Sequence, residues 1–204
     1  MELEAELQKC LNYLSSNWAM QNQKDDSNTN FIYHCNTVDE VIKQATINKA
    51  SINYALHRWY NYKTSTQVEQ IFCQFGAIKE QNKYHHDIDI YINNIPFDVK
   101  LTVFPSKIPH TLDLYTRDGK NTLINWYYNN QSKENRKQIV NRLYVVVDGK
   151  NNMALKSNTT LITPRISNFM SHIQQHGLNQ LFINLDGKTY KIYSDLVYVK
   201  DPNL

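Results

Sequence analysis

Carboxylates and one lysine gather in a strongly alternating stretch near the middle of the chain. The stretch reads HHDIDIYINNIPFDVKLTVFP from His85 to Pro105, and it contains Asp89, Asp98 and Lys100. Because strand side chains alternate between faces, Asp98 and Lys100 share one face of a strand while apolar neighbours take the other. A tight turn between two such strands would bring Asp89 close to them. Neighbouring carboxylates on a sheet repel one another, and a divalent cation would offset that repulsion.

These residue types fit the binding of a divalent cation and chemistry at a phosphate group. Mg²⁺ prefers carboxylate and water oxygens and uses few protein ligands, so Asp89 and Asp98 are the candidate ligands. Lys100 would position a water molecule or stabilise the negative charge that develops on a phosphate. Asp87 lies on the same strand face as Asp89 and competes with it for the metal. The step from Asp89 to Asp98 fits a tight turn between full strands, which favours Asp89.

Capping signals and hydrophobic periodicity predict the elements that position these residues. Thr37 with Glu40 forms a capping box that opens a helix, and Thr66 with Glu69 forms a second one whose short helix Gly76 ends. After Gly76 the hydrophobic period changes from about 3.6 to about 2 residues, which indicates strands. Helices are predicted at 2–20, 38–45, 52–60, 67–75, 121–141 and 164–175, strands at 77–83, 87–92, 95–104, 143–147, 181–185 and 189–199, and a loop at 21–30.

This order of elements predicts an α/β fold with a mixed central sheet flanked by helices. The chain has 204 residues, which is enough for one substantial core. Residues 1–204 are therefore expected to form a single domain.

The step from Asp89 to Asp98-Val99-Lys100 resembles the PD-(D/E)xK nuclease superfamily, which includes type II restriction endonucleases. A bare D-x-K pattern is common, but here a helix precedes three strands, and a helix and a strand follow them. No proline stands before the first aspartate, which departs from the superfamily pattern. Asp87 and Asp89 therefore both remain candidates for the first metal-binding aspartate. The resemblance covers residues 67–147, less than half of the chain.

The resemblance implies a restriction endonuclease-like αβββαβ core at residues 66–148. Extra N-terminal helices at 1–65 and a C-terminal β extension at 149–204 would decorate this core. Such additions suit an enzyme that reads a DNA sequence, as restriction endonucleases do. Cutting both strands of a duplex would suit a two-fold homodimer.

The resemblance also implies a role for each member of the site. Asp89 and Asp98 would bind Mg²⁺, for which Mn²⁺ can substitute, and Lys100 would assist the attack on phosphorus. Asp87 and Glu69 would be further metal ligands. The superfamily carries an acidic residue on the helix before the strands, and Glu69 stands there, although closing its capping box explains it almost as well. The implied activity is the metal-dependent cleavage of DNA by an endonuclease.

Cationic and amide side chains near these elements are candidates for contacts with the DNA backbone. A solvated helix face or an ordinary polar loop is the simpler explanation for the same charges. The candidates are Gln131, Lys133, Arg136 and Lys137 in the predicted helix at 121–141, and Lys107 and Arg117 in the loop before it.

Composition limits the alternatives. A net charge of +3 permits a DNA partner without requiring one. The three cysteines form no CxxC pair, the N-terminus is unlike a signal peptide, and no apolar run approaches the roughly 18 residues that span a bilayer. A cytoplasmic protein without membrane contact is therefore expected. No sequence motif supports a nucleotide-dependent motor, a dehydrogenase or a serine hydrolase. The alternative function is a non-catalytic DNA-binding or assembly module with a nuclease-like fold, and a tyrosine-rich protein-interaction domain ranks third.

Overall fold

The structure, a computed structural model, describes residues 2–15, 22–82, 85, 87–130, 140–185 and 187–203. It has an α/β fold with a mixed six-stranded sheet flanked by helices, and none of its helices has the length and apolar character needed to cross a membrane within those ranges. The chain divides into two compact units, Met1–Thr66 and Gln67–Leu204. The helices are α1 (Glu2–Leu11), α2 (Gln23–Asn28), η1 (Asn30–His34), α3 (Val38–Ile47), α4 (Ile52–Gln74), α5 (Arg117–Asn130), α6 (Asn152–Lys156) and α7 (Thr159–His176), and the strands are β1 (Ile78–Lys79), β2 (Ile90–Ile92), β3 (Ile95–Val103), β4 (Arg142–Asp148), β5 (Gln180–Leu185) and β6 (Lys188–Lys200).

Short helices and the N-terminal part of α4 form the first unit. The Thr37 hydroxyl accepts a hydrogen bond from the Glu40 N–H, and the Glu40 carboxylate accepts one from the Thr37 N–H, so the capping box predicted at α3 is confirmed. The fully buried indole of Trp59 donates to the carbonyl of Cys35 at 3.0 Å, which ties α4 to the segment before α3. The buried apolar side chains of this unit include Leu7, Cys10, Ile32, Val38, Val41, Ala45, Ala55, Leu56 and Tyr60.

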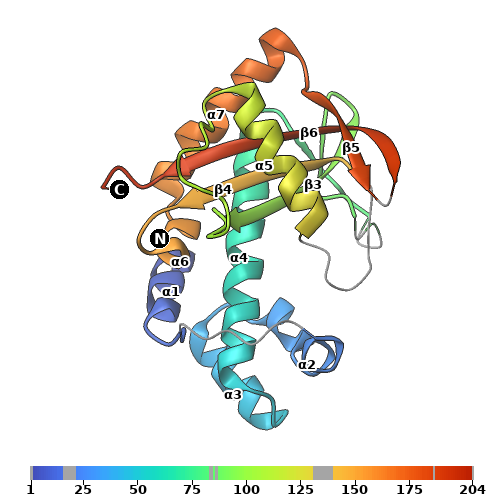
Figure 1. The fold of residues 1–204 in the computed structure, drawn as a ribbon. Helices are drawn as coiled ribbons and strands as arrows, with labels where there is room; N and C mark the ends of the chain where they lie inside the picture. Colours follow the sequence, from blue (N-terminus) through green and yellow to red (C-terminus); the bar gives the residue numbers. More distant parts are fainter. Residues whose placement is uncertain are drawn as a thin grey trace. The chain divides into compact units, whose positions relative to one another are not determined.

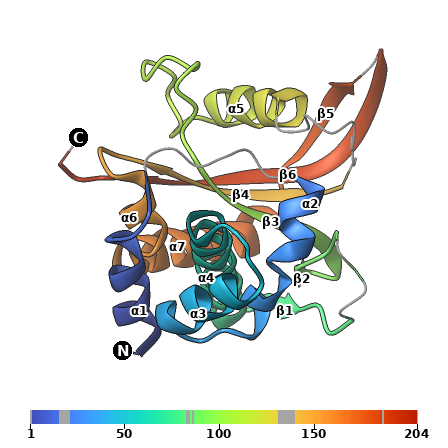
Figure 2. The ribbon, with the colours of Figure 1, turned by 90° about the horizontal axis from the view of Figure 1, so that it is seen from below.

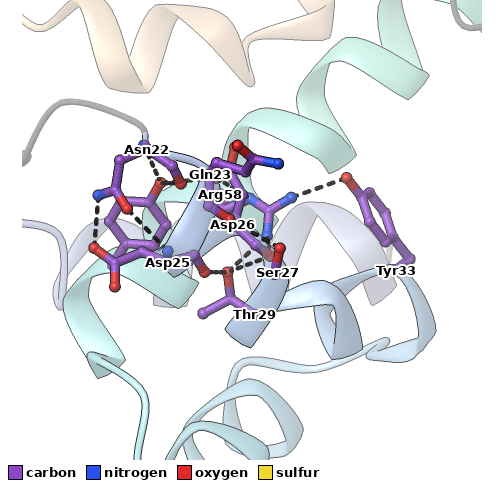
Figure 3. A network of polar contacts seen from close by, with 9 residues as sticks. Asn22, Gln23, Asp25, Asp26, Ser27, Thr29, Tyr33 and Arg58 are labelled. Carbon is purple, nitrogen blue, oxygen red and sulfur yellow. Dashed lines mark hydrogen bonds and ion pairs between the residues drawn. The ribbon is translucent and has the colours of Figure 1, made fainter.

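A buried arginine organises the polar contacts of the first unit (Figure 3). Arg58, on α4, is only 8% exposed, and its guanidinium donates to the Asp26 carbonyl and to the Thr29 hydroxyl, both at 2.6 Å. It also donates to the Tyr33 hydroxyl at 3.0 Å. Its Nε lies 3.1 Å from the Asp26 carboxylate, which accepts a further hydrogen bond from the Tyr54 hydroxyl. Arg58 therefore joins α4 to α2 and η1, two neighbouring helices that lie much earlier in the sequence.

The segment 21–30 contains the helix α2, so the loop predicted there is wrong for residues 23–28. Asn22 caps this helix, because its side chain accepts a hydrogen bond from the Asp25 N–H at 2.9 Å. Asp25 and Asp26 stand in the first turn, where the helix dipole favours negative charge. Arg58 and Tyr54, both on α4, contact α2, and the polar composition of the segment gives no sign of these contacts.

Replacement of Arg58 by Met is expected to destabilise the first unit by about 1–3 kcal/mol. The change removes the cation that the Asp26 carboxylate and the Thr29 hydroxyl contact. Hydrogen–deuterium exchange measures the effect, and protection of the α2 and η1 amides should fall by about tenfold or more. Lys43→Met changes an exposed lysine of α3 and is the control, with an expected effect below about 0.5 kcal/mol. Equal protection in the two variants would contradict a stabilising role for Arg58.

The sheet of the second unit has the strand order β1-β2-β3-β4-β6-β5. Strands β3, β4 and β6 are parallel, whereas the β1–β2, β2–β3 and β5–β6 pairs are antiparallel. The turn between β2 and β3 contains Asn93 and Asn94, both with positive φ (51° and 63°), which is the tight hairpin turn that asparagine tolerates. Along its length β3 changes neighbours, because residues 95–97 pair with β2 and residues from Asp98 onward pair with β4.

Helices cover both faces of this sheet. Figure 1 and Figure 2 show α5 on one face and α6 and α7 on the other. The core between the sheet, α7 and the C-terminal residues of α4 includes Phe72, Val145 and Ile166. The core under α5 includes Leu123 and Tyr144. Strand β4 is buried along almost its whole length, as its apolar run predicts.

Several predicted boundaries are corrected by the structure. The first helix ends at Leu11 rather than at residue 20, the first strand has two residues, and the second strand begins at Ile90. Helix α5, Arg117–Asn130, begins before the predicted start. Residues 131–139 of the predicted helix lie outside the described part of the chain. The strand predicted at 143–147 and the pairing predicted for the C-terminal strands are confirmed by β4 and by the β5–β6 hairpin.

Candidate functional site

The candidate site lies at the point along β3 where pairing with β2 on one edge ends and pairing with β4 on the other edge begins. Asp89 directly precedes β2, and its backbone N–H donates to the carbonyl of Phe97 at 2.8 Å. Its carboxylate Oδ2 accepts a hydrogen bond from the backbone N–H of Val99 at 2.7 Å. The carboxylate thus takes the place of a backbone carbonyl from a neighbouring strand, which fixes the Asp89 side chain at the splayed end of the hairpin.

The electrostatic surroundings of Asp89 are unfavourable for its ionised form. Burial raises the pKa of Asp89 to about 6, and the negative charges of Glu69 and Asp98 act in the same direction. The Val99 N–H and the Lys100 ammonium oppose this rise in pKa. A half-buried carboxyl group near two further carboxylates is a common feature of functional sites.

Asp98 is buried and contacts two cations. Its Oδ1 lies 2.7 Å from Nζ of Lys100, and its Oδ2 accepts a hydrogen bond from Nε of Arg142 at 3.1 Å. Lys100 follows two residues later on β3, and its side chain is 44% exposed while that of Asp98 is 7% exposed. Arg142 begins β4 and is the register partner of Asp98, and its guanidinium lies 5.2 Å from the ring centroid of Tyr128 on α5. The buried carboxylate therefore has one fixed cation and one that reaches solvent.

Glu69 lies in the interior of α4, so the capping box predicted with Thr66 is wrong. The helix is continuous through both residues, and a helix interior has no N-terminus to cap. Glu69 is 8% exposed and forms an ion pair with Lys79 on β1. Lys79 is paired in the sheet with Ile90, the residue after Asp89. Helix α4 and strand β1 thus bring Glu69 to the same end of the hairpin as Asp89.

Other predicted site residues lie elsewhere. Asp87 is in the turn before β2 and forms no hydrogen bond or ion pair with the residues that the structure describes. Lys107 is exposed in the loop after β3, likewise without an ion pair in the described ranges. Arg117 begins α5, and its guanidinium donates to Oδ1 of Asn179 at 2.6 Å. The remaining predicted DNA contacts fall outside the described residues, namely Gln131, Lys133, Arg136 and Lys137.

The structure adds two residues that sequence reasoning did not assign to the site. Arg142, which directly follows the helix predicted at 121–141, begins β4 and contacts Asp98. Lys79, on strand β1, forms an ion pair with Glu69. A charged residue at the start of an apolar strand run is the one signal that could have drawn attention to Arg142.

Carboxylate oxygens, the ligand type that Mg²⁺ prefers, come from Glu69, Asp89 and Asp98. Mg²⁺ commonly keeps several waters and takes only one or two carboxylates, so two of these residues are enough to hold it. In the ranges that the structure describes, no three His, Cys, Asp or Glu side chains are grouped closely enough to hold a metal ion by themselves. Comparisons with protein-family models, with curated proteins and with solved structures found no match to this chain.

Proposed function

We propose that this protein is a metal-dependent nuclease that hydrolyses phosphodiester bonds in DNA, with Mg²⁺ as its metal and Mn²⁺ as a substitute. The observation that carries the proposal is the environment of Asp89. Burial, Glu69 and Asp98 raise the pKa of this carboxyl group to about 6, so its ionised form is disfavoured in the folded protein. A hard divalent cation is the chemical counterpart that would stabilise the ionised Asp89 carboxylate beside that of Asp98.

The order of elements supports the same proposal. Helix α4, strands β1 to β3, helix α5 and strand β4 follow the αβββαβ order of PD-(D/E)xK nucleases. The acidic residues stand on α4, before β2 and in β3, as that superfamily requires. We therefore interpret residues 66–148 as a restriction endonuclease-like core, with β5 and β6 as its C-terminal extension.

The roles follow from the chemistry of the side chains. Asp89 and Asp98 would hold the cation, with Glu69 as a further ligand. When bound, the cation supplies Lewis-acid stabilisation of the charge that develops on the phosphate oxygens. The Lys100 ammonium, close to Asp98 and partly exposed, can contact a phosphate oxygen and stabilise its negative charge. Arg142 holds the second oxygen of Asp98 and so orients that carboxylate.

Cleavage of supercoiled plasmid DNA tests the proposal. We expect conversion to nicked and linear forms with Mg²⁺ or Mn²⁺ and none with EDTA. Asp98→Asn protein, purified in parallel, gives the background from contaminating nucleases and should remain at that background. Single-stranded DNA and RNA substrates show whether another polynucleotide is preferred. Metal-dependent cleavage at equal rates by the wild-type and Asp98→Asn proteins would reject this site.

A non-catalytic DNA-binding or assembly module with the same fold is the second candidate. Three ion pairs favour this candidate, because in such a module they are structural and need no metal ion. They join Asp98 to Lys100 and Arg142, and Glu69 to Lys79. Calorimetric titration with Mn²⁺ separates the two functions. Binding of Mn²⁺ that is lost in Asp89→Asn supports the nuclease, whereas DNA binding in EDTA without Mn²⁺ binding or cleavage supports the module.

A further inference from the structure

A hollow of about 420 Å³ lies beside the outer edge of β6. Strand β5 pairs with β6 only as far as Tyr193, so from Asp195 onward this edge of β6 has no strand partner in the described part of the chain. The N-terminus of α5 and the middle of α7 line the hollow. A second hollow of about 230 Å³ adjoins it, because Tyr115 and Arg165 line both. The volume of the first hollow is in the range of small-molecule sites, which begins at about 300 Å³, and the second hollow is smaller than that.

Positive charge exceeds negative charge around this hollow. Arg117, Lys120 and Arg165 line it, and Asp195 is the one acidic residue among its lining residues. Lys120 lies 4.0 Å from the Asp195 carboxylate, which also accepts a hydrogen bond from the Leu196 N–H at 2.7 Å. Neither arginine forms an ion pair with a carboxylate within the described ranges. Both guanidinium groups can therefore donate to an external anion, although the charge of Arg117 also acts on Asp195 from beyond ion-pair distance.

Arg117 is held in place before any ligand arrives. Its Nη1 donates to Oδ1 of Asn179, a residue that is only 6% exposed. The Nδ2 of Asn179 donates in turn to Oδ1 of Asn121 at 3.0 Å and to the carbonyl of Ser194 at 2.9 Å. Because the amide is fixed by both partners, the guanidinium loses little further freedom on binding. The planar fork of N–H groups in arginine matches the oxygens of a phosphate.

An aromatic surface stands beside these cations. The ring of Tyr115 is 70% exposed and makes an edge contact with the ring of Tyr198, with 5.9 Å between the centroids. The Tyr198 hydroxyl donates to Asp148 at 2.5 Å, which fixes the second ring. An exposed tyrosine next to cationic side chains is a platform on which a nucleobase can stack. The imidazole of His172 and the amide of Asn168 also line the hollow and can bond to the edge of a base.

We propose that this hollow, the β6 pocket, binds a nucleoside phosphate whose phosphate contacts Arg117 and Arg165 and whose base stacks on Tyr115. The ligand is either a free nucleotide or the end of a nucleic-acid strand, since both present the same groups. The β6 pocket is separate from the acidic site, because Asp195 is paired with Leu143, which is paired in turn with Val99 on β3. Binding there needs neither the metal nor the proposed cleavage.

Calorimetric titration of the full chain in EDTA tests the proposal, since EDTA removes any contribution from metal-dependent cleavage. The ligands are deoxyadenosine 5′-monophosphate, deoxyadenosine, inorganic phosphate and a deoxyadenosine tetranucleotide. We expect the monophosphate to bind more tightly than deoxyadenosine or phosphate alone. Arg165→Gln should raise its Kd by about tenfold or more, because a hydrogen-bonded charge is lost. Tyr115→Ala should weaken binding of the monophosphate but not of inorganic phosphate.

Lys191→Gln removes an exposed cation on β6 outside the pocket and is the matched control, with a Kd expected within about twofold of wild type. Binding of the tetranucleotide alone would support the proposal and identify a strand end as the occupant. Binding of neither nucleotide ligand would overturn it. So would an equal Kd in Arg165→Gln and Lys191→Gln. Equal affinity for inorganic phosphate and the monophosphate would overturn the assignment of a nucleoside.

Discussion

Replacement of Lys100 by Met is expected to lower the rate of Mg²⁺-dependent DNA cleavage by about 100-fold or more, with the fold and the metal affinity retained. Asp98 keeps Arg142 at 3.1 Å in this variant, so the buried carboxylate is not left without a cation. The loss then reflects charge that Lys100 stabilises on the phosphate rather than unfolding. Single-turnover cleavage of a linear duplex with excess enzyme measures the rate, and circular dichroism checks the fold.

Lys79→Met is a closely matched control for this experiment. The Lys79 side chain is 42% exposed and paired with Glu69, as the Lys100 side chain is 44% exposed and paired with Asp98. Lys79 has no contact with the phosphate in the proposed mechanism, so the cleavage rate should change by less than about fivefold, while loss of its ion pair with the buried Glu69 carboxylate acts on stability. Equal losses of cleavage rate in Lys100→Met and Lys79→Met would mean that the rate depends on the total positive charge near the carboxylates and not on Lys100 in particular. A wild-type rate in Lys100→Met would remove this lysine from the active site.

The two capping patterns show what a local signal can and cannot predict. Thr37 with Glu40 caps α3 as expected, because the preceding segment is extended and leaves an N-terminus to cap. Thr66 with Glu69 has the same spacing, yet both lie inside the long helix α4. Whether a helix begins at a capping residue depends on whether the upstream segment is already helical, which the four-residue pattern does not contain. The structure thus removes the capping explanation for Glu69, and it leaves the carboxylate paired with Lys79.

The proximity of Asp89 to Asp98 could be predicted because a hairpin is a local structure. The Asn93-Asn94 turn sets the register of β2 against β3, and all the residues concerned lie within one short stretch. The contact of Asp98 with Arg142 depends instead on parallel pairing between β3 and β4, with α5 between them in the sequence. Parallel register arises from packing across the whole sheet, so no pattern around Arg142 indicates its partner.

The choice between Asp87 and Asp89 could not be decided from strand alternation alone. Both residues were expected on one face of a single strand, but β2 begins only at Ile90. Asp87 therefore lies in a turn, whereas Asp89 bonds to Val99 at the point where the strands separate. The difference arises because the pairing of β2 with β3 stops at Ile90 and Phe97. Beyond that point the Val99 N–H donates to the Asp89 carboxylate instead of to a strand carbonyl.

Replacement of Asp89 by Asn is expected to stabilise the metal-free protein by about 1–3 kcal/mol at pH 7. The folded-state pKa of about 6 exceeds the ordinary value of 3.8, so the folded protein binds this proton more readily than the unfolded chain. The contribution of Asp89 to stability is therefore most favourable at low pH, falls as the pH rises from about 4 to about 6, and is fully unfavourable above pH 6. Asparagine does not ionise, and its amide oxygen can still accept the Val99 N–H. Urea denaturation in EDTA should show the advantage of the variant at pH 7 and little of it at pH 4.

Asp87→Asn makes the same chemical change two residues earlier and is expected to alter stability by less than about 0.5 kcal/mol. Addition of Mg²⁺ should then favour the wild type, because a ligand that binds only the folded state stabilises it in proportion to the logarithm of its concentration over Kd. The Asp89→Asn protein lacks a principal metal ligand, so added Mg²⁺ should increase its stability only slightly. A carboxylate that destabilises the metal-free fold and becomes stabilising with the metal acts as a metal ligand rather than as a structural residue. If Asp89→Asn is no more stable than Asp87→Asn at pH 7, Asp89 is not electrostatically strained, and the main support for the nuclease proposal is lost.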